Sequence, residues 1–146
     1  MYANDGSREL GRHECLRLLA TAAIGRVVHT RQALPAVAPV AFGLDGDGAV
    51  LLRTSAASEL ARAVDGAVVA FEADAFDVDT HSGWSVVVTG RAAVVSDRAE
   101  VERLERIGPR SWAPSPGEVF VHIEPELVTG RELVGDRTTY GLHLPA

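Results

Sequence analysis

The sequence contains no lysine. All 14 basic residues are arginine, and with 20 acidic residues the formal net charge is −6. Domains that bind nucleic acid normally carry a basic surplus or a local arginine-rich stripe, and this sequence has neither. We therefore expect no nucleic-acid partner. Without lysine, a phosphate group could be bound here only by arginine, by hydroxyl groups or by backbone N–H groups.

Cysteine is almost absent as well. Cys15 is the only one, which excludes an intramolecular disulfide and a cysteine-based zinc site, and we expect it to be a buried thiol on a helix face. Asp74, Asp77, Asp79 and His81 share one acidic segment. Because further ligands that would complete a metal shell are missing there, we predict solvated side chains and no metal site.

Long hydrophobic runs are the third absence. No stretch of the sequence approaches the ~20 apolar residues that a helix needs to cross a bilayer. Residues 1–12 are polar and lack the apolar centre of a signal peptide. These two observations predict a cytoplasmic protein that is not attached to a membrane.

The composition that remains is that of a globular protein, with 47% hydrophobic and 23% charged residues. A chain of 146 residues can bury a core without disulfides or metals, so we expect one domain over residues 1–146. The patterned part covers about residues 10–133. The tail, residues 134–146, has no strong pattern and could be a strand, an arm on a partner or loose chain.

Hydrophobic periodicity predicts an α+β fold, an antiparallel β-barrel of six to seven short strands with about three peripheral helices. The helices are expected at residues 7–23 with Ser7 as N-cap, 55–64, and 98–107 after Asp97. The strands are expected at residues 24–30, 34–44, 49–54, 67–73, 82–95, 119–123 and 127–133. Gly90 marks a bulge or a close approach of two backbones. Glu72 is either a solvent-facing strand residue or a buried acid with a partner.

A strand that runs directly into a helix is the first candidate binding feature. Arg53 and Thr54 end the strand, and Ser55 or Ser58 can cap the helix that follows. A guanidinium, hydroxyl groups and unpaired N–H groups at such a junction can bind an anion. Such residues more often form an ordinary helix cap beside a surface charge.

Proline and tryptophan mark three further positions. Pro39 interrupts an apolar strand, and because proline cannot donate to a ladder, the backbone groups of Val40 and Ala41 could be free for a ligand. Trp84 lies where the longest strand begins. Trp112 lies between prolines in the loop 108–117, where it could be a lid, a subunit contact or part of the packing of its own domain.

An ordered set of short motifs resembles the pyridoxamine 5′-phosphate oxidase-like family of flavin-binding split β-barrels, over about residues 10–133. The motifs are Gly25-Arg26, Pro39-Val40, Arg53-Thr54 with Ser58-x-Leu60, Val69-Ala70-Phe71-Glu72, Gly83-Trp84-Ser85-Val86, Gly90-Arg91-Ala92, Trp112-Ala113-Pro114, Ile123-x-Pro125 and Thr129-Gly130-Arg131.

The resemblance implies a homodimer with two flavin sites at the subunit interface and FMN as the usual cofactor. It also implies an oxidoreductase for a small organic substrate, in which the cofactor supplies the hydride chemistry and no side chain is needed as acid or base. The phosphate would be held by Arg53, Thr54 and Ser58, and the ring would lie along the backbone of Pro39, Val40 and Ala41. Further contacts would come from Ser82, Gly83, Trp84, Ser85 and Trp112.

One position departs from the family pattern. Family members commonly have lysine in the Ser-Lys-Leu of the second helix, and this chain has Glu59 there. A carboxylate next to a phosphate weakens binding, so a cofactor-free dimeric binding or structural protein on the same barrel is the alternative. Some actinobacterial branches of the family use a deazaflavin. We rank a deazaflavin-dependent reductase lower, because its polyglutamyl tail needs a basic groove.

Overall fold

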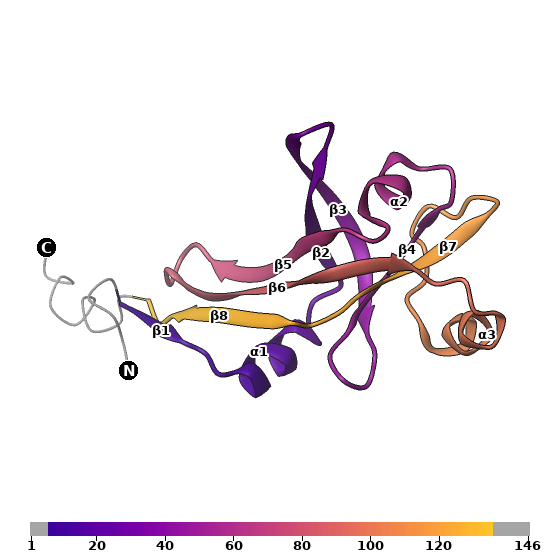
Figure 1. Ribbon diagram of the computed structural model, residues 1–146. Coiled ribbons are helices and arrows are strands. Elements are labelled where there is room, and N and C mark those ends of the chain that lie inside the picture. Colours follow the sequence, from indigo (N-terminus) through magenta and orange to yellow (C-terminus); the bar gives the residue numbers. More distant parts are fainter. Residues whose placement is uncertain (1–5, 136–146) are drawn as a thin grey trace, which may run out of the picture.

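The computed structural model describes residues 6–135, which form eight strands and three helices (Figure 1). In chain order these are β1 (Ser7–Glu9), α1 (Arg12–Leu19), β2 (Ile24–Arg31), β3 (Leu34–Leu44), β4 (Val50–Ser55), α2 (Glu59–Val64), β5 (Val68–Asp77), β6 (Ser82–Val94), α3 (Arg98–Ile107), β7 (Glu118–Ile123) and β8 (Leu127–Leu133). Within this part of the chain no helix has the length and apolar character needed to span a membrane.

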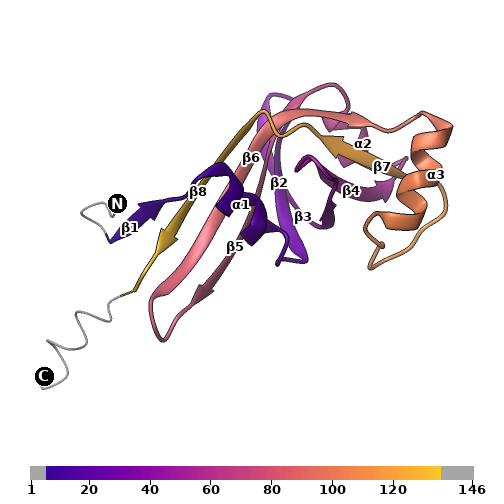
Figure 2. The same cartoon turned by 90° about the horizontal axis from the view of Figure 1, so that it is seen from below.

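Six of the strands close into an antiparallel barrel in the order β6-β5-β2-β3-β4-β7, because β6 pairs with both β5 and β7. Along its other edge β6 first pairs with β8, from Gly83 to Thr89, and then with β7, from Ala92 to Val94. β8 and β1 therefore extend the sheet beyond the barrel (Figure 2). The predicted class, an α+β split barrel with three helices, is confirmed.

β3 is shared between two partners. Its residues up to Ala41 pair with β2, and only Phe42, Gly43 and Leu44 pair with β4. Pro39 lies just before this change of partner, as expected for a residue that cannot donate to a ladder. The β2–β3 hairpin therefore reaches beyond the barrel, as Figure 1 shows, and the end of β4 diverges from β3 instead of continuing along it.

The core fills the barrel with apolar side chains that alternate along each strand. Val27, Leu52, Phe71 and Val88 are fully buried inside, and Cys15 of α1 packs onto the same cluster, which confirms its predicted burial on a helix face. On the outer face of β4 the alternation is completed by a second, smaller cluster of Leu51, Leu104 and Phe120, which brings α3 against the barrel. Residue 53 shares that outer face.

The predicted start of the first helix is wrong. Ser7 is not an N-cap: it lies in β1, paired with Leu133 of β8. The helix begins after Gly11, whose backbone N–H donates to Glu14 Oε1 at 3.3 Å, and it ends at Leu19 rather than at residue 23. A three-residue strand such as β1 is held by its partner near the other end of the chain, so local periodicity does not reveal it.

Glu72 combines features of the two alternatives, since it is half-buried on the outer face of the sheet and has an arginine partner. Its Oε1 lies 3.0 Å from Arg26 Nη1, and the same nitrogen lies 3.4 Å from Asp74 Oδ2. Burial, with the neighbouring Asp74 carboxylate as the second cause, raises the pKa of Glu72 to about 7. Two acids therefore share one arginine on the outer face of the sheet, where β2 and β5 pair.

Gly90 is confirmed as a point where two backbones approach closely. We therefore expect the Gly90→Ala variant to lower the free energy of unfolding by about 3 kcal/mol or more. A Cβ added there would lie 1.7 Å from the carbonyl oxygen of Glu124, which belongs to the backbone and cannot rotate away. Urea unfolding measures the change. Gly46→Ala is the matched control, because nothing lies within 4 Å of an added Cβ at that position. Equal stability of the two variants would contradict the close approach.

The raised pKa of Glu72 makes stability depend on pH. A carboxyl group that binds its proton more tightly in the folded than in the unfolded chain favours folding while it is protonated. The free energy of unfolding should therefore fall as the pH rises from 4.5, the ordinary pKa of the group, to about 7. Allowing for solvent screening of a partly exposed side chain, the fall is about 1–2 kcal/mol.

Urea unfolding at a series of pH values tests this pH dependence. In the Glu72→Gln variant the group no longer titrates, so that part of the decline should disappear. An unchanged pH profile in the variant would show that Glu72 titrates near its ordinary value.

Candidate functional site

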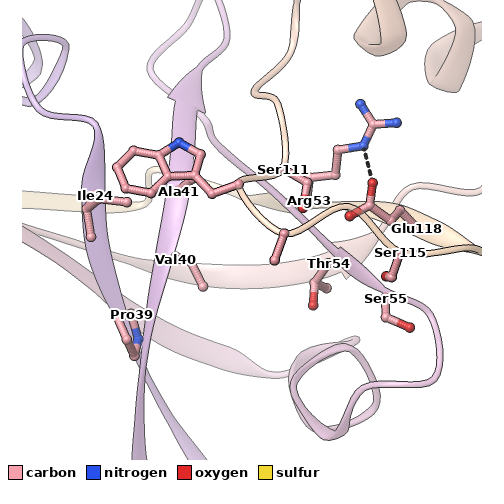
Figure 3. A pocket seen from close by; sticks show the side chains of 12 residues that line it. Ile24, Pro39, Val40, Ala41, Arg53, Thr54, Ser55, Ser111, Ser115 and Glu118 are labelled. Atoms are coloured by element: carbon pink, nitrogen blue, oxygen red, sulfur yellow. Dashed lines mark ion pairs between the residues drawn. The ribbon is translucent and has the colours of Figure 1, made fainter.

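A cavity of about 480 Å³ opens where β3 leaves β4. Three segments enclose it: the middle of β3 with the start of β2, the C-terminal end of β4, and the chain that leads from α3 into β7 (Figure 3). The lining residues are Ile24, Pro39, Val40, Ala41, Arg53, Thr54, Ser55, Ser111, Trp112, Ala113, Ser115 and Glu118. One side is therefore apolar, and the other carries hydroxyl groups and charge.

The sequence predicted half of these lining positions. Of the eleven expected cofactor residues, the structure brings six to this cavity: Pro39, Val40, Ala41, Arg53, Thr54 and Trp112. They come from three separate parts of the chain. The indole of Trp112 is 73% exposed, so the cavity is bounded there by a large aromatic side chain that its own domain does not cover.

Arg53 is held on the outer face of β4 by two carboxylates and an aromatic ring. Its Nε lies 3.2 Å from Glu118 Oε1, and its Nη2 donates to Glu105 Oε2 of α3 at 3.2 Å. The guanidinium carbon lies 4.8 Å from the centroid of the Phe120 ring, a cation–π contact. The Nε–H is buried without good hydrogen-bond geometry, so its contact with Glu118 is a short ion pair rather than an aligned hydrogen bond.

Thr54 and Ser58 form a separate pair of hydroxyl groups. Their oxygens lie 3.2 Å apart, and Ser58 Oγ also accepts from the backbone N–H of Ala61 at 3.0 Å. Ser58, rather than Ser55, is thus the N-cap of α2. Thr54 lines the cavity, whereas Ser58 is not among its lining residues. In Figure 3 the Arg53 side chain extends away from Thr54, toward Glu118.

The four expected residues of β6 lie elsewhere. Ser82, Gly83, Trp84 and Ser85 pair with the far end of β5, opposite Asp77, Phe76, Ala75 and Asp74. They are not among the residues that line the cavity. Trp84 is half-buried and packs against the main core, which differs from a strand start that presents its indole to a ligand. Any contribution of this segment to the cavity would have to come from a second copy of the chain.

Glu59 does not face the cavity. Its carboxylate lies 2.8 Å from Arg31 Nη1 at the tip of the β2–β3 hairpin, and its side chain is 61% exposed. The carboxylate that the cavity does face is Glu118, which sequence reasoning missed. Glu118 lies directly opposite Ser55 in the β4–β7 ladder, a pairing between distant parts of the chain that no local pattern indicates.

The chemistry of the cavity is that of a binding site. Among its described lining residues there is one cation, Arg53, and one acid, Glu118, with three serine hydroxyls and Thr54 around them. The apolar side formed by Ile24, Val40 and Ala41 suits a flat ring system. The volume lies in the ordinary range for small-ligand sites, about 300–1,000 Å³.

Comparison with known proteins agrees with the split-barrel fold and identifies the family. The family model for pyridoxamine 5′-phosphate oxidase matches residues 11–132. An uncharacterised protein of Mycobacterium tuberculosis is 46% identical over 136 residues, which cover 90% of this chain and 88% of that protein.

Two solved structures share the fold. The FAD-binding protein of Mycobacterium smegmatis superposes with a TM-score of 0.72 at 33% identity and covers 86% of this chain and 98% of its own. A conserved protein of unknown function from Corynebacterium diphtheriae superposes with a TM-score of 0.75 at 33% identity, covering 89% and 100%. The matched residues include both β3 and β4 and the loop that carries Trp112, and this chain belongs to the pyridoxamine 5′-phosphate oxidase family.

Proposed function

We propose that this protein binds a flavin in the cavity between β3, β4 and the loop before β7, and that it is an FMN-dependent oxidoreductase for a small organic substrate. The observation that carries the proposal is the convergence of six expected cofactor residues on one cavity. The FAD-binding relative from Mycobacterium smegmatis, 33% identical, supports a flavin as the class of ligand.

The cavity offers a distinct place for each part of a flavin. The apolar side with Pro39, Val40 and Ala41 would lie along the ring system, and Trp112 would cover it from the loop. Arg53 and Thr54 would meet the phosphate end. A single arginine among the described lining residues suits a ligand with one phosphate group, which favours FMN.

The residues of the chain itself would bind the flavin and orient it. A bound flavin supplies the hydride chemistry. The apolar side of the cavity and the indole of Trp112 would exclude water from one face of the ring, and the serine hydroxyls would orient its polar edge. No acid–base side chain needs to reach the reacting atoms, so the substrate would be selected by the shape of the opening.

Flavin binding tests this proposal directly. Titration with FMN, FAD or reduced deazaflavin, followed by flavin fluorescence, should show the tightest binding for FMN. Arg53→Gln should weaken FMN binding about tenfold or more, because a charged contact to phosphate is lost. Arg98→Gln is the control: it removes an exposed arginine of α3 that does not line the cavity. Absence of binding by any flavin at tens of micromolar would refute the proposal.

We further propose that the protein is a homodimer in which each site takes Ser82–Ser85 from the other subunit. In a two-fold dimer of Arg53→Gln with Ser85→Phe, one site would carry both changes and the other neither. Co-expression of the two variants should thus restore about a quarter of the FMN sites, although each variant alone binds poorly. Light scattering gives the oligomeric state. A mixture that binds no better than its parents would place all contacts within one subunit.

A cofactor-free dimeric protein on the same barrel is the second candidate. The sequence suggested this candidate because Glu59 would repel a phosphate. In the structure Glu59 forms an ion pair with Arg31, so this argument no longer applies. Another observation favours it: Arg53 already has two carboxylate partners, Glu105 and Glu118. This candidate expects Arg53→Gln to leave ligand binding unchanged, whereas flavin binding expects a loss.

A further inference from the structure

The ion pair of Arg53 with Glu118 lies inside the proposed flavin site. The Arg53 side chain is 23% exposed and that of Glu118 only 11%, so the pair is largely removed from solvent. Both residues line the cavity (Figure 3). A ligand phosphate that reaches Arg53 therefore meets a cation whose charge is already balanced, and it meets a carboxylate beside it.

The backbone keeps Glu118 in this place. β4 and β7 pair from Val50 to Ser55, with Arg53 opposite Phe120 and Ser55 opposite Glu118. Directly paired residues point to the same side of a sheet, and so do residues two apart. Arg53, Ser55, Glu118 and Phe120 thus share one face, and the ladder fixes the backbone of Glu118 at the cavity edge.

The second carboxylate is less effective. Glu105 of α3 also contacts Arg53, but its side chain is 52% exposed. Interactions of exposed charges are screened by water and salt, and such ion pairs contribute little. Glu118, which is shielded from solvent, is therefore the carboxylate whose charge a ligand in the cavity would feel most.

We propose that Glu118 determines the specificity of this site for the phosphate end of its ligand, by competing with phosphate for Arg53. This rests on the proposed flavin function. Repulsion requires a charged ligand, so Glu118 opposes the phosphate of FMN and the pyrophosphate of FAD, both of which are anionic, and does not oppose uncharged riboflavin. The residue thereby limits how tightly FMN is held and makes the cofactor exchangeable.

The test compares three ligands on matched variants. Dissociation constants for riboflavin, FMN and FAD are measured by flavin fluorescence for the wild type and for Glu118→Gln, Glu105→Gln and Glu59→Gln. Each variant removes one negative charge, but only the first removes the shielded carboxylate in the cavity. Thermal unfolding confirms that each variant is folded, and Glu118→Ser serves as a second removal of the carboxylate.

Glu118→Gln should tighten FMN binding about tenfold or more, because the phosphate is no longer repelled by Glu118 and Arg53 keeps only the exposed Glu105 as a carboxylate partner. FAD should also bind more tightly, riboflavin should change less than about twofold, and Glu105→Gln should have a smaller effect of the same sign on FMN. Glu59→Gln should leave all three affinities unchanged, since Glu59 pairs with Arg31 outside the cavity.

Two results would overturn the inference. Weaker FMN binding by Glu118→Gln would mean that the carboxylate orients Arg53 for the phosphate instead of competing with it. An equal change for FMN and riboflavin would mean that Glu118 acts on the ring or on the fold. Both results leave flavin binding itself intact. Failure of every variant to bind any of the three ligands would instead refute the proposed function, and the inference with it.

Discussion

The β4–β7 ladder is the constraint on which the candidate site depends. β7 joins β6 to β4 and so closes the barrel, and its pairing with β4 sets which side chains stand beside the cavity. On the outer face, Phe120 packs with Leu51 and Leu104 and supports the guanidinium of Arg53. Phe120 therefore links the apolar contact with α3 to the position of the Arg53 guanidinium, and a change in that packing would also move Arg53.

The pairing of arginines with carboxylates is the second property that shapes the site. In a chain without lysine, arginine is the only side chain that is always cationic, and it can hold two carboxylates at once through its planar fork. Arg53 does so with Glu105 and Glu118, and Arg26 does so with Glu72 and Asp74. Such pairs satisfy partly buried charges. At Arg53 the same pairing also decides how much positive charge is left for a ligand.

Most strands and helices could be predicted because the patterns that specify them extend over only a few neighbouring residues. The alternation of apolar residues placed seven of the eight strands, and Asp97 placed the third helix. The second helix was predicted with Ser55 or Ser58 as its cap, and it begins after Ser58. β1 escaped prediction because its three residues are held by β8, far away in the sequence. The first helix was then predicted too early, since Ser7 satisfies a backbone partner in a strand instead of capping a helix.

Sequence patterns were sufficient to predict the barrel class, the buried Cys15 and the close approach at Gly90. The family resemblance named residues of β3, β4 and the Trp112 loop, and the structure places these at one cavity. The carboxylates beside Arg53 could not be predicted from the sequence, because they come from α3 and β7. Sequence neighbourhood pointed to Glu59, the first residue of α2, which pairs with Arg31 outside the cavity. Strand pairing instead brought in Glu118. The physical reason is that charges interact through space, and antiparallel pairing joins residues whose separation along the chain carries no local signal.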